Sequence, residues 1–114
     1  MEHRDVFLLE SIVEYCDKAA SYLRDNHITK QSFLENSYFQ DTCAFYCLQI
    51  GELASSLSDT FIDDHKEIKW RNIVNLRNII AHDYGKVDSG LLWDIIERNI
   101  PELRDFCAKV IGIE

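Results

Sequence analysis

The sequence predicts an all-α fold, an up-and-down four-helix bundle with a possible extra short helix and a proline-kinked last helix. Residues 1–114 would form one domain. Hydrophobic residues make up 46% of the chain, which is too many for disorder, while four glycines and one proline are too few turn formers for a many-stranded sheet protein. Apolar residues also recur at intervals of three and four, as they do on the buried side of a helix.

The first helix is predicted over the N-terminal quarter of the chain. Asp5 precedes the apolar pattern and is the expected N-cap. The apolar stripe that predicts this helix is Val6, Leu9, Val13, Cys16, Ala20 and Leu23.

The second helix follows residues 29–36, which are polar enough for a turn or a short helix. Gly51 lies inside the second helix, where glycine costs about 1 kcal/mol relative to alanine, so a close contact with another helix is expected there. The apolar stripe of this helix is Phe39, Cys43, Tyr46, Ile50, Leu53 and Leu57.

Residues 58–64 are expected to form a loop. Its acids, Asp59, Asp63 and Asp64, would be exposed or would cap the next helix, with a cation site as the less favoured reading. The third helix should then run from Lys66 or Trp70 to Tyr84. Gly85 would end it, since glycine readily adopts the left-handed conformation that follows many helices.

The fourth helix should begin after Asp88 or Ser89. Pro101 lies within its pattern and should kink or split it, because proline lacks a backbone donor. The predicted stripe is Leu92, Ile96, Asn99, Leu103, Phe106 and Val110.

The charge distribution restricts the kind of partner. A formal net charge of −8 argues against a protein that coats nucleic acid unselectively. Residues 66–86 hold five Lys or Arg against two acids, a local balance of +3, so the remaining residues carry −11. This contrast suits a small anionic target at one place and a basic protein partner elsewhere, although a solvated mixed-charge helix is the simpler reading.

The four cysteines lack a C-x-x-C pair, so buried reduced thiols are expected and no metal or cofactor is predicted. Metal binding by Cys43 and Cys47, one helical turn apart, is a minor alternative. Residues His3, His27 and His65 should be exposed. The sequence shows no apolar run of about 20 residues and no signal core, so no membrane association and a cytoplasmic location are expected.

Residues 77–84 read Arg-Asn-Ile-Ile-Ala-His-Asp-Tyr, and we call them the octet. The guanidinium of Arg77 can hold a phosphate in a bidentate fork, while the imidazole of His82 can transfer protons near neutral pH. At about 100° per residue these two side chains lie about 140° apart around an ideal helix. Convergence on one phosphate would need a distorted helix or a second copy of the octet.

The octet resembles the R-N-x-x-A-H-x-Y signature of HepT-like toxins, which belong to the HEPN superfamily of four-helix domains. Arg77, Asn78, Ala81, His82 and Tyr84 match all five defining positions.

The resemblance extends over most of the chain. Ile50-Gly51-Glu52 is similar to the I-G-E of the family's second long helix, and Trp70 to the Trp that opens its third. Leu91-Leu92-Trp93 through Ile100-Pro101 is similar to its last helix. The family often has prolines before the Trp, where this chain has Glu67-Ile68-Lys69.

The resemblance implies a metal-independent endoribonuclease toxin that cleaves RNA at a homodimer cleft. Arg77 would stabilise charge on the phosphate and His82 would act in acid-base catalysis. Asn78, four residues before His82, is close enough to orient the imidazole or bind the phosphate, and Lys86 and Arg71 of the basic segment are further candidates for substrate binding. A partner nucleotidyltransferase, the antitoxin, would silence the toxin by adding AMP to Tyr84. A dimer joined through the third and fourth helices is expected, with Trp70, Leu91 and Trp93 flanking the octet.

Other readings remain open. The chain could be a non-catalytic HEPN subunit that binds a nucleotide or serves as the partner of a nucleotidyltransferase. Arg77 could pair with a carboxylate such as Glu52, whose place beside Gly51 in an apolar helix is unusual, and this pairing is compatible with catalysis. Tyr84 could be a core aromatic with its hydroxyl at the rim.

Overall fold

The computed structural model describes residues 1–82 and 88–113, and the side chains of residues 1–78 and 88–113. Within these residues all regular secondary structure is helical, which confirms the all-α prediction. The elements are α1 (His3–Asp25), α2 (Lys30–Leu34), α3 (Ser37–Ala54), α4 (Asp59–Asp64), α5 (Trp70–His82), α6 (Ser89–Asp94), the π-helical turn η1 (Ile95–Asn99) and α7 (Ile100–Ile111).

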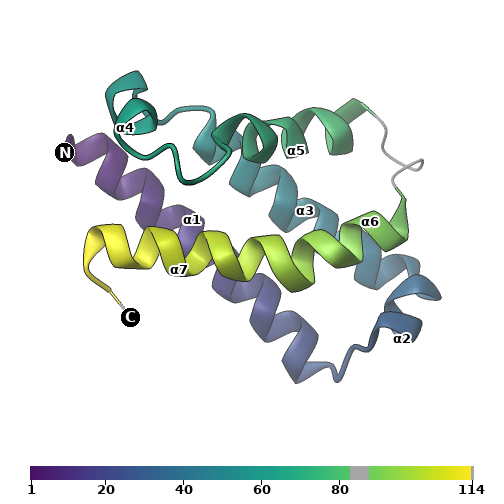
Figure 1. Ribbon diagram of the computed structural model, residues 1–114. Helices are drawn as coiled ribbons and strands as arrows, with labels where there is room; N and C mark the ends of the chain where they lie inside the picture. The colour runs from purple at the N-terminus through teal and green to yellow at the C-terminus, as the bar shows by residue number, and fades with distance from the viewer. Residues whose placement is uncertain (83–87, 114) are drawn as a thin grey trace.

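The long helices pack around α3. It contacts α1 along one side and α5 along the other, and α7 returns to pack on α1 (Figure 1). The packing of α5 is chiefly on α3, and its contacts with α6 and α7 are sparse by comparison. The helix that carries the octet is therefore positioned mainly by α3.

The buried apolar residues form one cluster between these helices. The predicted stripes contribute Leu9, Val13, Cys43 and Ile50 to it, whereas Ala20 is exposed because its neighbour Ala19 faces the core instead. Residues 29–36, where a turn or a short helix was expected, contain the short helix α2. Thr29 and Ser32 cap the N-terminus of α2 with a reciprocal capping box. Phe33 of α2 is fully buried, 5.4 Å from the Trp93 ring between centroids, so this polar-looking segment supplies part of the core.

Asp5 is not the N-cap of the first helix. The helix begins two residues earlier, after Glu2, and the Asp5 carboxylate is buried at 2% exposure. It accepts hydrogen bonds from the Ser58 backbone N–H (2.9 Å) and the Ser58 hydroxyl (2.6 Å). Its role is therefore tertiary, since it joins the start of α1 to the start of α4.

The loop predicted at residues 58–64 is wrong, because residues 59–64 form α4 and Ser58 is its N-cap. The Ser58 hydroxyl accepts a hydrogen bond from the Phe61 N–H and caps this helix, while the Phe61 ring enters the core. Asp59, Asp63 and Asp64 are exposed, as expected. Acidic composition concealed the helix, since only one of its residues is fully buried.

The last helix contains a π-turn just before Pro101, the place where the sequence predicted a kink or a split. In Figure 1 the segments α6, η1 and α7 follow one another as a continuous helical ribbon. The Ile100 N–H bonds to the carbonyl of Ile95, five residues back, and Pro101 occupies the first turn of α7. The extra residue of the π-turn shifts the helical phase, so Asn99 is exposed and the stripe predicted through it is wrong at that position.

Candidate functional site

The start of α5 is fixed by Trp70, which resolves the choice between Lys66 and Trp70. The Trp70 indole N–H donates to the His65 carbonyl at 2.8 Å, and the ring packs against Phe61 and Phe106. Trp70 is 4% exposed and Trp93 is 9% exposed, so both belong to the core of one chain. The expectation that these two residues flank the octet on a dimer surface is therefore wrong, while Leu91, 48% exposed, remains accessible.

The middle of α5 lies against Gly51 of α3, which confirms the close helix contact expected there. A Cβ atom placed on Gly51 would come within 2.8 Å of the Arg77 backbone nitrogen and 3.2 Å of the Ile73 carbonyl oxygen. These separations are shorter than van der Waals contact, so only glycine allows α3 and α5 to approach this closely. The approach places Arg77 at the crossing point of the two helices.

Arg77 is half-buried and pairs with the residue after Gly51. Its Nε atom lies 3.6 Å from the Glu52 Oε1 atom, and the two side chains are 33% and 52% exposed. The pairing considered from the sequence is therefore present. A partly exposed pair of this kind contributes about 0–1 kcal/mol to stability.

Three of the predicted site residues line one groove. Arg71, Arg77 and Asn78 border a hollow of about 510 Å³ that runs beside α5 to the end of α3 and the start of α4. Its wall also includes Asn75 and Ser55. Guanidinium and amide groups can donate hydrogen bonds to an anion or to the edges of bases.

Asn75 is the groove residue that sequence reasoning missed. It is exposed, four residues after Arg71 and three before Asn78, so the three share one face of α5. The helical spacing back from the octet was the signal that could have identified it.

The remaining site residues are only partly described. His82 is the last residue of α5, and by helical position it follows Asn78 on the same face. Tyr84, Gly85 and Lys86 lie outside the described residues, as does the predicted end of the helix at Tyr84.

The cysteines are free and buried, as expected. Burial raises the pKa of Cys43 and of Cys107 from 9.0 to about 12, and it raises the pKa of the Cys16 and Cys47 thiols further. Such thiols stay protonated and are poor metal ligands. Among the side chains that the structure describes, those of residues 1–78 and 88–113, no group of three or more His, Cys, Asp or Glu is arranged to hold a metal ion.

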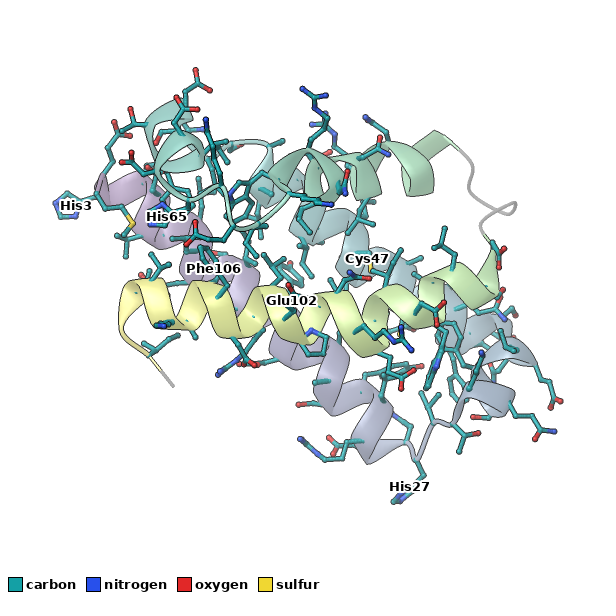
Figure 2. All side chains as sticks on the ribbon, viewed as in Figure 1. His3, His27, Cys47, His65, Glu102 and Phe106 are labelled. Atoms are coloured by element: carbon teal, nitrogen blue, oxygen red, sulfur yellow. The ribbon has the colours of Figure 1, made fainter. Side chains whose placement is uncertain are left out.

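The histidines outside the octet differ in environment. His3 and His27 project into solvent, as predicted (Figure 2). His65 is only half-exposed, which corrects the prediction: its ring stacks on Phe61 at 4.2 Å between centroids and faces Phe106 edge-on. The His65 ring thus has a packing role, while its backbone carbonyl accepts the hydrogen bond from the Trp70 indole.

Comparison with known proteins identifies the family. A sequence model described as "Ribonuclease HepT-like" matches residues 12–110, which include the groove, Arg77 and His82. This chain belongs to the HepT-like ribonuclease family. No helix within the part of the chain that the structure describes is both long enough and apolar enough to cross a membrane.

HepT-like relatives include proteins from archaea. A probable ribonuclease HepT of Thermococcus cleftensis is 29% identical over 95% of this chain and 94% of its own length. A candidate RNase of Methanocaldococcus jannaschii is 28% identical over 91% of this chain and 94% of its own. A second protein of that organism, named as a gamma-glutamylcyclotransferase and candidate RNase, is 27% identical over 90% of this chain, which spans only 46% of it. No solved structure matches this chain.

Proposed function

We propose that this HepT-like protein is a metal-independent endoribonuclease in which Arg77 and His82 carry the chemistry. The observation that carries the proposal is the position of Arg77, which is held at the α3–α5 crossing and borders a groove with Arg71 and Asn78. His82 follows on the same helix, and the family match covers both residues. The ribonuclease names of the relatives support RNA as the substrate.

The proposed reaction is an internal transesterification of RNA. The 2′-oxygen attacks the adjacent phosphorus as its proton leaves, the bond from phosphorus to the 5′-oxygen breaks, and that oxygen receives a proton. His82 acts in these proton transfers, and Arg77 stabilises the charge on the pentacoordinate phosphorus. Asn78 orients the imidazole or binds phosphate, while Arg71 and Lys86 bind the flanking backbone. The products end in a cyclic phosphate and a 5′-hydroxyl, and DNA is not cut because it lacks the 2′-hydroxyl.

Two copies of the chain would complete the cleft. Arg77 and His82 lie about 140° apart around an ideal helix, and α5 is regular α-helix through His82, so a distorted helix does not bring them together. A two-fold axis beside α5 would place Arg77 of one chain near His82 of the other. The exposed Leu91 is available to that interface.

The direct test is RNA cleavage by the purified protein in the presence of EDTA. We expect single-stranded RNA to be cut to cyclic-phosphate ends, with Arg77→Ala and His82→Ala each reducing kcat/KM by about 100-fold or more. His3→Ala changes an exposed histidine at the far end of α1 and is the matched control. Equal cleavage by wild type and His82→Ala would remove the proposed catalyst.

A non-catalytic role in a nucleotidyltransferase complex is the second candidate. The observation that favours it is that Glu52 already occupies one side of the Arg77 guanidinium. In that case the wild-type protein would bind nucleotide or its partner with no turnover, and Arg77→Ala would weaken binding only.

We also propose that a nucleotidyltransferase antitoxin controls the enzyme by adding AMP to Tyr84. The added phosphodiester would bring negative charge close to the basic residues of the site and fill space that RNA needs. Intact-mass analysis after co-expression with the cognate transferase would detect the adduct, and Tyr84→Phe should cleave RNA but escape control. Unmodified wild-type protein, or modification of another residue, would contradict this mechanism.

A further inference from the structure

The contact between Glu52 and Arg77 is made on one side of the guanidinium. The Glu52 Oε1 atom lies 3.6 Å from Arg77 Nε. A planar guanidinium offers two donor edges, one that includes Nε and one formed by Nη1 and Nη2. A carboxylate on the Nε side leaves the Nη1–Nη2 edge to face a second anion, such as a phosphate.

Consecutive residues of α3 position this arginine. Gly51 lets α5 approach until a Cβ at residue 51 would lie 2.8 Å from the Arg77 backbone nitrogen. Glu52 is the next residue, so the close approach brings its carboxylate level with the Arg77 side chain. Gly51 thus sets where the arginine backbone lies, and Glu52 sets how its side chain is turned.

We propose that Glu52 is a positioning residue, which acts through Arg77 and turns the guanidinium so that its Nη1–Nη2 edge meets the scissile phosphate. This inference rests on the proposed ribonuclease function and adds a residue to it. An arginine side chain has many rotamers, and holding it in one of them before RNA binds removes an entropic cost from the transition state.

The position of Glu52 gives it opposite effects on binding and on turnover. Its negative charge lies beside the cation that receives the phosphate, so it weakens ground-state attraction for RNA. Its contact with the guanidinium favours the transition state, because the arginine is then already oriented toward the phosphate. Removal of the carboxylate should therefore lower kcat without raising KM, a result that loss of simple RNA binding would not give.

The kinetic experiment compares Glu52→Gln with wild type on one single-stranded RNA. We expect kcat to fall by about threefold to fivefold, with KM unchanged or lower. In the Arg77→Ala background, Glu52→Gln should cause no further loss, because Glu52 acts through Arg77. The control is Glu14→Gln, which breaks a comparable surface pair with Lys18 (3.5 Å) on α1 and should leave both constants unchanged.

A second measurement tests the pairing without RNA. In the folded protein, the ¹⁵N–¹H resonance of Arg77 Nε, assigned by its loss in Arg77→Lys, should shift in Glu52→Gln and not in Glu14→Gln. An unchanged resonance in Glu52→Gln would refute the pairing itself. A shifted resonance with unchanged kcat, or an equal loss of kcat in the Arg77→Ala background, would refute the positioning role. If the wild-type protein cleaves no RNA, the proposed ribonuclease function is wrong, and so is the catalytic role of Glu52. The resonance would still show in that case whether Glu52 and Arg77 are paired.

Discussion

A few side chains in this protein join parts of the chain that are far apart in the sequence. Asp5 bonds to Ser58 across 53 positions, and Arg104 donates to Asp17 at 3.0 Å across 87 positions. Arg77 meets Glu52 in the same way, from one helix to another. The local pattern around Asp5 indicated a helix cap, but the carboxylate is used to join two elements, and its partner could not be read from its neighbours.

Replacement of Asp5 should destabilise the fold. Asp5→Ala would leave the Ser58 N–H without its acceptor in a partly buried place and would loosen the hydroxyl that caps α4. We expect a loss of about 1–3 kcal/mol in the free energy of unfolding, measured by urea denaturation. Asp59→Ala, which removes an exposed carboxylate next to Ser58, should cost less than about 0.5 kcal/mol. Equal losses in the two variants would show that the Asp5 bonds contribute little.

The short helices α2 and α4 depend on tertiary contacts that their amino-acid composition does not reveal. α4 looks like an acidic loop and α2 like a polar turn, yet each places one phenylalanine, Phe61 or Phe33, in the core. α5 differs from these two, because the sequence predicted a helix there and left only its start open between Lys66 and Trp70. Its place in the molecule depends on a single glycine of α3.

Gly51→Ala tests that dependence. Alanine favours a helix interior by about 1 kcal/mol over glycine, so a free surface position would be stabilised by the change. Here the new Cβ would meet backbone atoms of α5, and we expect a net loss of about 1–3 kcal/mol together with displacement of Arg77 and reduced RNA cleavage. Circular dichroism during urea unfolding would measure the stability.

The matched control for this change is Gly90→Ala in the first turn of α6. The added methyl group there would meet only the Asp88 side chain at 3.2 Å, so a small change is expected. A Gly51→Ala protein as stable and as active as wild type would show that the α3–α5 contact does not position the site.

At the scale of the whole molecule, α1, α3 and α7 enclose the thiols. Cys16, Cys43, Cys47 and Cys107 are free and at most 2% exposed. They should resist alkylation at about pH 8 in the native protein and react when the protein unfolds, which mass spectrometry can count. Rapid modification of any one of them in native buffer would contradict this closed core.

The same burial predicts how stability depends on pH. The pKa of Cys43 and of Cys107 is raised to about 12 in the folded protein, against 9.0 when exposed. Below pH 9 the thiols are protonated in both states and their stabilising contribution is complete. As the pH rises from 9 toward 12 the unfolded chain loses these protons first, so stability should fall, and Cys43→Ala and Cys107→Ala should each reduce the slope of thermal midpoint against pH.

Self-association is the other prediction at this scale. If two chains share the proposed cleft, light scattering at micromolar concentration should give the mass of a dimer. Co-expressed Arg77→Ala and His82→Ala chains should then behave differently from either pure variant, because one of the two shared clefts would keep both groups. A monomer, or a mixture whose activity is the average of the two pure proteins, would contradict the shared cleft.

The sequence by itself determined the helical class, the long helices with most of their buried stripes, the buried thiols and the octet, because each depends on residues close together in the chain. The tertiary structure decided what those residues meet. Trp70 and Trp93 lie in the core, and residues expected to form a loop form α4. Pro101 is accommodated in the first turn of α7, after a π-turn, and Arg77 lies against Gly51 and Glu52. These outcomes depend on how closely two helices can approach and which side chains then share a space. That distance is a property of the packed pair, so neither helix encodes it alone.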